Sequence, residues 1–183
     1  YVVNFKGTKN ILVAMHANNV GKLVRITGAT VNKSPFNLIT CLFNLLLSMT
    51  NKWHERSEKA IRDSGVDYTV IRPTEIRSEP PASESNRSLL LLIPGDSRIQ
   101  APLPGKISKE DLADLLVMAA SDTRLSRVTA IASSVAGSPH DISANICSKT
   151  WEPLVALQQA DTRAITTSPH NAALSVFVSS LAL

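Results

Sequence analysis

Two short segments of the sequence carry residues whose types and spacing suit the binding of a flat ligand. The first is Thr27-Gly28-Ala29, which follows the strand-like run Lys22–Ile26. The second is Arg72-Pro73-Thr74-Glu75, which follows Tyr68–Ile71, a run rich in β-branched residues. Small residues after a strand let a ligand approach the backbone, and α/β proteins bind ligands at the carboxyl ends of parallel strands. We therefore predict a ligand site at these two segments, against the simpler alternatives of a plain turn and a plain strand terminator.

The residues before the second segment indicate why it should lie at a strand end. Asn51–Arg62 has the pattern of an amphipathic helix. Gly65, just after it, is the expected helix stop, and Pro73 ends the strand that follows. A helix, a glycine cap and a buried strand in this order are typical of parallel α/β sheets. We predict that the buried stripe of this helix consists of Trp53, Ser57, Ala60 and Ile61. We also predict two ion pairs on its solvated face, Glu55–Lys59 and Glu58–Arg62.

Other segments extend the same α/β pattern. We predict helices at Gly7–Asn18, Pro35–Met49 and Trp151–Leu157, and a strand at Val128–Ala132. A further helix would begin after Ser108 as its N-cap and bury Leu112, Leu115, Leu116 and Ala119. Leu89–Ile93 predicts a strand that continues through the turn Pro94-Gly95-Asp96 into a hairpin. That hairpin would belong to a small substrate-side insertion at about 75–106, whose proline- and serine-rich part suits a lid.

Composition bounds the class of protein. The chain has 183 residues, 44% hydrophobic and 19% charged, which is ordinary for one globular domain. The net charge of +4 comes from dispersed basic residues, and this argues against a nucleic-acid partner. Pro35–Met49 is apolar nearly all round but shorter than the roughly 20 residues that span a bilayer, so we predict no transmembrane segment. That helix would pack in the core or face a greasy substrate or a partner.

The two cysteines, Cys41 and Cys147, show no metal-binding spacing, and we predict no metal site and no disulfide framework. They suit buried thiols in a reducing compartment, the cytoplasm or an organelle. The sequence starts without methionine and shows no signal-peptide layout, so an upstream part and its targeting signal are expected to be missing.

The order of these motifs resembles the atypical short-chain dehydrogenase/reductases, in their NmrA-like NAD(P)-binding branch. The matching segments are Gly7–Asn10, Val20–Ala29, Ser64–Thr74, Ile107–Ala113, Trp151–Leu154 and Asp161–Arg163. The resemblance implies a Rossmann-like parallel sheet with flanking helices over 1–163, incomplete at its amino terminus, and a tail of uncertain order at 164–183. It also implies an NAD(P) cofactor, with Thr27, Gly28 and Ala29 beside it at one strand end and Arg72, Pro73, Thr74 and Glu75 near the nicotinamide at the next. The Thr74 hydroxyl would bond the carboxamide.

The sequence departs from this family in two ways. It has no glycine-rich GxGxxG turn to hold the pyrophosphate, so we expect a fragment that lacks the glycine-rich half and binds NAD(P) weakly or not at all. It also has no Tyr-x-x-x-Lys pair, the usual proton donor of the wider superfamily. His54 is the weak catalytic candidate in that region, and a partly exposed helical histidine is the simpler interpretation.

Three hypotheses therefore remain open. The first is an NAD(P)-dependent oxidoreductase of the atypical short-chain dehydrogenase type, acting on a small organic substrate. The second is a non-catalytic NAD(P)-binding module for redox sensing or assembly, acting through a protein partner. The third is a truncated, nucleotide-free remnant. Turnover with a nicotinamide cofactor separates the first from the others, and binding without turnover indicates the second.

Overall fold

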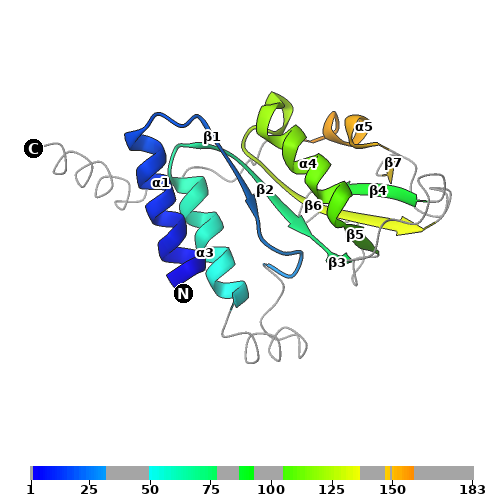
Figure 1. Cartoon of the computed structure of the whole chain (residues 1–183), viewed down its shortest axis with the longest axis horizontal. Helices are drawn as coiled ribbons and strands as arrows, with labels where there is room; N and C mark the ends of the chain where they lie inside the picture. Colours follow the sequence, from blue (N-terminus) through cyan, green and yellow to red (C-terminus); the bar gives the residue numbers. More distant parts are fainter. Residues whose placement is uncertain are drawn as a thin grey trace, which may run out of the picture. The chain divides into compact units, whose positions relative to one another are not determined.

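The computed structural model describes residues 2–31, 50–77, 87–92, 105–136, 147–148 and 150–158 (Figure 1). The chain divides into two compact units. The first comprises Tyr1–Leu23, Thr30–Tyr68 and Thr162–Leu183, and the second comprises Val24–Ala29 and Thr69–Asp161.

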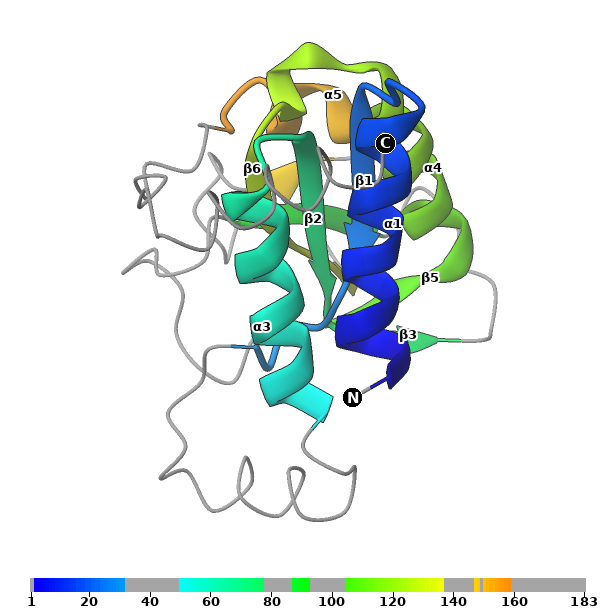
Figure 2. The ribbon, with the colours of Figure 1, turned by 90° about the vertical axis from the view of Figure 1, so that its left-hand side faces the viewer.

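The described part of the first unit is helical. It consists of the π-helical turn η1 (Val2–Lys6), α1 (Gly7–Ala17) and α3 (Thr50–Asp63). The two α-helices lie side by side, and η1 contacts both of them (Figure 2). Both predicted helices are confirmed, whereas the turn η1 was not predicted. The buried residues of the two α-helices are Thr8, Leu12, Met15, Ser57, Glu58 and Ile61.

Two details of α3 correct the sequence analysis. Glu58 is fully buried and bonds Arg62 at 3.2 Å, so this predicted pair forms but does not lie on a solvated face. Lys59 pairs with Asp63 at 2.6 Å rather than with Glu55. Glu58 stands beside Ser57 and one turn before Ile61, which places it on the buried stripe of the helix.

Gly65 ends α3 as predicted. Its φ of +79° lies in the left-handed region, and no atom stands within 4 Å of the position that a Cβ would take. The requirement for glycine is therefore conformational rather than steric. The hydroxyl of Ser64 donates to the Ile61 carbonyl at 2.7 Å and accepts from the Val66 N–H at 3.2 Å, which closes the turn.

A five-stranded sheet contributes most of the second unit. Its order is β1 (Lys22–Ile26), β2 (Asp67–Pro73), β6 (Val128–Ala136), β4 (Arg87–Leu92) and β7 (Cys147–Ser148). Strands β2 and β6 run parallel, with Ile71 opposite Ala130 and Pro73 opposite Ala132. Strand β4 is antiparallel to both β6 and β7. The α/β prediction is confirmed, and the parallel part of the sheet includes the strand that precedes Thr74.

The strand predicted at Leu89–Ile93 is confirmed by β4, which covers Arg87–Leu92. It lies inside the main sheet, between β6 and β7, so its described partners come from distant parts of the sequence. The hairpin predicted through Pro94–Asp96 falls on residues outside the described ranges and stays a prediction. The extent of the insertion at about 75–106 stays a prediction.

Helices α4 (Lys109–Ser121) and α5 (Trp151–Val155) cover one face of this sheet. The shared core is mainly aliphatic: Ile71, Leu89, Leu91, Ile107, Leu112, Leu115, Ala119, Leu125, Val128, Ala130, Ala132, Trp151, Leu154 and Val155. Leu90, Leu92 and Ile131 are buried on the opposite face. The predicted buried face of α4 is confirmed at Leu112, Leu115 and Ala119, with Leu116 packed at its edge.

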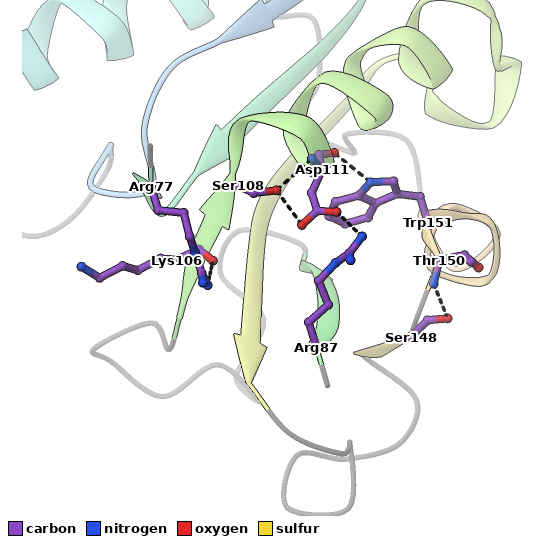
Figure 3. Close-up of polar contacts among 8 residues, drawn as sticks. All are labelled: Arg77, Arg87, Lys106, Ser108, Asp111, Ser148, Thr150 and Trp151. Carbon is purple, nitrogen blue, oxygen red and sulfur yellow. Dashed lines mark hydrogen bonds and ion pairs between the residues drawn. The ribbon is translucent and has the colours of Figure 1, made fainter. Parts of the chain in front are cut away.

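A buried polar network joins α4 to its neighbours (Figure 3). Ser108 is the N-cap predicted from the sequence, and its hydroxyl accepts from the Asp111 N–H at 3.0 Å and donates to the Asp111 carboxylate at 2.8 Å. The carboxylate also accepts from Arg87 Nη2 of β4 at 2.6 Å. Trp151 Nε1 of α5 donates to the Asp111 carbonyl at 2.9 Å. Asp111 thus connects α4 with a strand and with the last helix.

A second charged cluster lies at the ends of α4 and α5. Arg124, in the 3₁₀ turn η3 (Thr123–Leu125), contacts Asp122 at 2.5 Å and Glu152 at 2.8 Å. Hydrogen bonds from the guanidinium to the Asp122 carboxylate first, and then to Glu152, raise the pKa of Arg124. The guanidinium is exposed, and surface ion pairs of this kind add little to stability.

A small parallel pair, β3 (Glu75–Arg77) with β5 (Lys106–Ser108), lies after β2. Glu75 and Lys106 form an exposed ion pair at 2.6 Å. Gly105, just before β5, has φ of +86°, and a Cβ built there would stand 2.1 Å from the Ser134 carbonyl oxygen of β6. Only glycine allows this approach.

Several predictions fall outside the described residues. These are the apolar helix Pro35–Met49, the part of the predicted lid at 78–86, the turn Pro94–Asp96, the tail 164–183 and the environment of Cys41. Within the described ranges, no helix has both the length and the apolarity needed to cross a bilayer.

Candidate functional site

Backbone hydrogen bonds bring the two predicted ligand segments together at one end of the sheet. The Thr27 N–H donates to the Ile71 carbonyl at 3.0 Å, and the Ala29 N–H donates to the Pro73 carbonyl at 3.0 Å. From the first of these bonds to the second, the donor moves two residues along the chain, from Thr27 to Ala29, and so does the acceptor, from Ile71 to Pro73. The first segment therefore runs parallel to the end of β2. The Thr74 N–H then donates to the Ala132 carbonyl of β6 at 3.0 Å. The segment after β1 thus lies against the end of β2, and the residue that follows β2 lies against the middle of β6.

The second segment presents a hydroxyl pair. The Thr74 hydroxyl donates to Ser133 Oγ at 3.0 Å, across from β2 to β6. Thr74 is half-buried, whereas Ser133 is 1% exposed. Thr74 is therefore the accessible member, held in place by a buried serine. Its oxygen keeps lone pairs for a further donor such as an amide N–H.

Ser133 was missed by the sequence analysis. It lies in the run Ala132-Ser133-Ser134, beyond the strand Val128–Ala132 that was predicted. The signal that would have found it is a pair of hydroxyl residues at the end of a buried strand. Its partnership with Thr74, however, depends on the register between β2 and β6, which local patterns do not reveal.

The other residues of the second segment have different environments. Arg72 is 2% exposed, and because strand residues alternate it points to the face opposite Ile71, which packs under α4 and α5. Pro73 is buried, and Glu75 is exposed and paired with Lys106. Among the residues from 72 to 75, Thr74 alone combines a polar group with partial access to a ligand and no charged partner.

The first segment offers backbone rather than functional side chains. Thr27, Gly28 and Ala29 are each half-buried, and Gly28 has no Cβ to hold a ligand away. Ala29 also packs beside the apolar cluster of Leu90, Leu92 and Ile131. A flat ring placed here would meet small side chains, an aliphatic surface and the Thr74 hydroxyl.

His54 lies in α3, is half-buried and belongs to the first unit, whereas the Thr27–Ala29 and Thr74 segments belong to the second. The role of His54 as a proton donor stays a prediction. Within the described residues, no group of three His, Cys, Asp or Glu side chains is arranged to hold a metal ion.

This geometry fits one end of a dinucleotide better than the other. A nicotinamide ring is flat and carries an amide, which suits small residues beside a threonine hydroxyl. A pyrophosphate needs converging N–H groups at a glycine-rich turn before a helix, and the sequence has no GxGxxG motif to supply them. The Thr27–Ala29 segment and Thr74 therefore fit the nicotinamide side of such a ligand.

Comparison with known proteins identifies the family. Residues 3–123 match the family described as NAD(P)H-binding, which covers more than half of the chain. The chain therefore belongs to the NAD(P)H-binding family, and the resemblance stated from the sequence is confirmed.

Two curated relatives are chloroplastic proteins of Arabidopsis thaliana. Protein TIC 62 is 25% identical over 126 residues, which are 69% of this chain and 18% of that protein. An uncharacterized protein is 30% identical over 121 residues, which are 64% of this chain and 40% of that protein. The chain thus spans less than half the length of these relatives.

Solved structures agree on the fold. A candidate NAD-dependent epimerase/dehydratase from Bacillus halodurans aligns with a TM-score of 0.56 at 10% identity, over 76% of this chain and 58% of that one. A wide-type short-chain dehydrogenase/reductase from Veillonella parvula, solved in complex with NADP, aligns with a TM-score of 0.53 at 19% identity, over 73% of this chain and 58% of that one. The Rossmann-like fold class is confirmed, and the chain is an NAD(P)-binding domain of this fold.

Proposed function

We propose that this chain supplies the nicotinamide side of an NAD(P) site in an oxidoreductase of the atypical short-chain dehydrogenase type, acting on a small organic substrate. The observation that carries the proposal is that Thr27 and Ala29 bond Ile71 and Pro73 at the end of β2, where the next residue, Thr74, bonds Ser133. The cofactor would supply hydride transfer when bound. The chain's own residues would orient it.

Each residue has a distinct part in this proposal. Gly28 and Ala29 leave space for the ring, and the Thr74 hydroxyl accepts a hydrogen bond from the carboxamide. Ser133 positions Thr74 by accepting its hydrogen bond. Pro73 fixes the backbone between the buried Arg72 and Thr74. The affinity contributed by these residues is weak, because the phosphate-binding turn is not among them.

A thermal-shift titration with NADPH and NADH tests this proposal. Ligand that binds only the folded chain raises its stability by about 2.7 kcal/mol at 100 times Kd. The variant Thr74→Val removes the hydroxyl and keeps the shape, and loss of one hydrogen bond of about 1 kcal/mol predicts roughly fivefold weaker binding. Thr150→Val is the matched control, because Thr150 is exposed and its side chain bonds nothing in the α5 cap.

The two variants distinguish binding at Thr74 from binding elsewhere on the chain. Binding that weakens in Thr74→Val and not in Thr150→Val supports the proposed site. A folded chain that shows no shift at millimolar nucleotide refutes NAD(P) binding by this chain. Equal weakening in both variants refutes the role of Thr74.

The lack of a Tyr-x-x-x-Lys pair in this sequence favours a second, non-catalytic function. The sequence has two tyrosines, Tyr1 and Tyr68, and neither is followed four residues later by lysine. Tyr68 is 2% exposed within β2. We propose as the alternative a non-catalytic NAD(P)-binding module that senses redox state or assembles with a protein partner. Nucleotide binding without consumption of NADPH across a panel of small carbonyl and quinone substrates would select it.

We also propose an organellar location, because the two curated relatives described above are chloroplastic. Immunolocalisation of the native protein in fractionated cells tests this. Recovery in the cytosolic fraction alone would contradict it.

A further inference from the structure

Two adjacent aromatic rings with a cation over each of them lie on the first unit. Phe5 of η1 and Trp53 of α3 contact each other, with ring centroids 6.2 Å apart and planes inclined by 35°. Lys9 Nζ lies over the Phe5 ring at 5.1 Å from its centroid, and the Arg56 guanidinium lies over the Trp53 ring at 4.9 Å. We call these four residues the cation–aromatic row.

Both cations of the row are accessible, whereas the rings are partly covered. Lys9 and Arg56 are exposed, and Phe5 and Trp53 are half-buried. A cation that rests on a ring keeps its charge and loses part of its freedom, so a partner anion binds it with less ordering cost. The row therefore holds two positive charges in fixed places on the surface.

The charge distribution of the sequence strengthens this observation. The basic residues are dispersed along the chain, but the acidic ones are not. Residues 1–54 contain six lysines and arginines and no aspartate or glutamate, since the first acid is Glu55. The remaining residues carry 13 basic and 15 acidic side chains, obtained by subtracting six from 19 and none from 15. Positive charge therefore accumulates in the part of the sequence that supplies Phe5, Lys9 and Trp53, and such asymmetry is typical of binding to an anionic partner.

The geometry of the rings decides which anionic partner fits. Binding of single-stranded nucleic acid relies on ring faces that stack with bases, and insertion into a membrane relies on rings that project into lipid. Here a cation lies over each ring, at Phe5 and at Trp53. The charged groups of the row itself are an ammonium and a guanidinium, and carboxylates are their ordinary protein partners.

We propose that the cation–aromatic row is a docking surface for an acidic segment of a partner protein, whose carboxylates pair with Lys9 and Arg56. Trp and Arg are the residue types enriched at the energetic centres of protein interfaces, which agrees with the stacked Trp53–Arg56 pair. This proposal is independent of the nucleotide, because every residue in it belongs to the first unit.

Fluorescence anisotropy of labelled poly-L-glutamate with the whole chain tests the proposal. Lys9→Gln removes one charge from an exposed helical lysine, and Lys109→Gln in α4 is the matched control at an exposed lysine outside the row. We expect Lys9→Gln to weaken binding about two- to fivefold, as for an exposed charge pair, and Lys109→Gln to leave it unchanged. The double variant Lys9→Gln/Arg56→Gln should weaken it about tenfold, as two such pairs add. Arg56→Lys keeps the charge and should retain more affinity than Arg56→Gln.

Three results would overturn the proposal. One is the absence of poly-L-glutamate binding by a chain whose thermal unfolding shows it to be folded. Another is an equal loss in Lys9→Gln and Lys109→Gln, which would indicate general charge attraction. The third is tighter and equally variant-sensitive binding to phosphatidylglycerol vesicles or to a single-stranded oligonucleotide, which would assign the surface to lipid or nucleic acid instead.

Discussion

Replacement of Asp111 by asparagine is expected to destabilise the second unit strongly. The carboxylate is buried, with 3% of the side chain exposed, and its partner Arg87 is 13% exposed. The substituted side chain would keep the shape, and the backbone bond to Trp151 would remain, but the negative charge 2.6 Å from the buried Arg87 guanidinium would be lost. Removal of one partner of a buried pair costs about 3–5 kcal/mol, and the retained amide oxygen reduces this to about 3 kcal/mol.

Thermal unfolding measures this effect. For a chain of this size, each kcal/mol lowers Tm by about 2–4 °C, so Asp111→Asn should lower it by about 6–12 °C. Asp114→Asn on the same helix is the matched control, because Asp114 is exposed, and its Tm should change little. A double-mutant cycle with Arg87→Met should show that most of the loss is shared between Arg87 and Asp111. Equal Tm values for the two asparagine variants would refute the reasoning.

Three further predictions concern stability and are checked by urea denaturation. Gly105→Ala should cost more than about 3 kcal/mol, because the new Cβ meets the Ser134 carbonyl in a left-handed backbone, whereas Gly21→Ala, which has open space, should stay within about 0.5 kcal/mol. Gly65→Ala should cost about 1 kcal/mol from φ of +79° alone, and Gly65→Asn should cost less; a neutral alanine would contradict a left-handed Gly65. Glu58→Gln should cost about 2 kcal/mol because Glu58 is buried beside Arg62, while the exposed Glu55→Gln should be nearly neutral; the reverse order would show that Glu58 is solvated.

Local signals in the sequence predicted much of this fold. The strand Lys22–Ile26 has the predicted bounds, Gly65 ends α3, and Ser108 caps α4. Each of these features depends on residues within one or two turns of chain, where propensity and capping act directly.

Features set by distant partners were not predictable in the same way. The place of β4 between β6 and β7 depends on strand pairing across the sequence, which local patterns do not reveal. Ser133 becomes a partner of Thr74 only through the β2–β6 register. Burial of Glu58 overrides the solvated-face pattern that its neighbours Lys59 and Arg62 indicate.

We propose that NAD(P) binds this chain at the sheet end formed by Thr27–Ala29 and Thr74. A titration of isotopically labelled protein with NADPH, followed by amide NMR, tests it most directly. We predict shift changes concentrated at the amides of Gly28, Ala29, Thr74 and Ser133, and a loss of the response at position 74 in Thr74→Val. A folded chain whose amides do not respond, or respond only outside this segment, would contradict the claim.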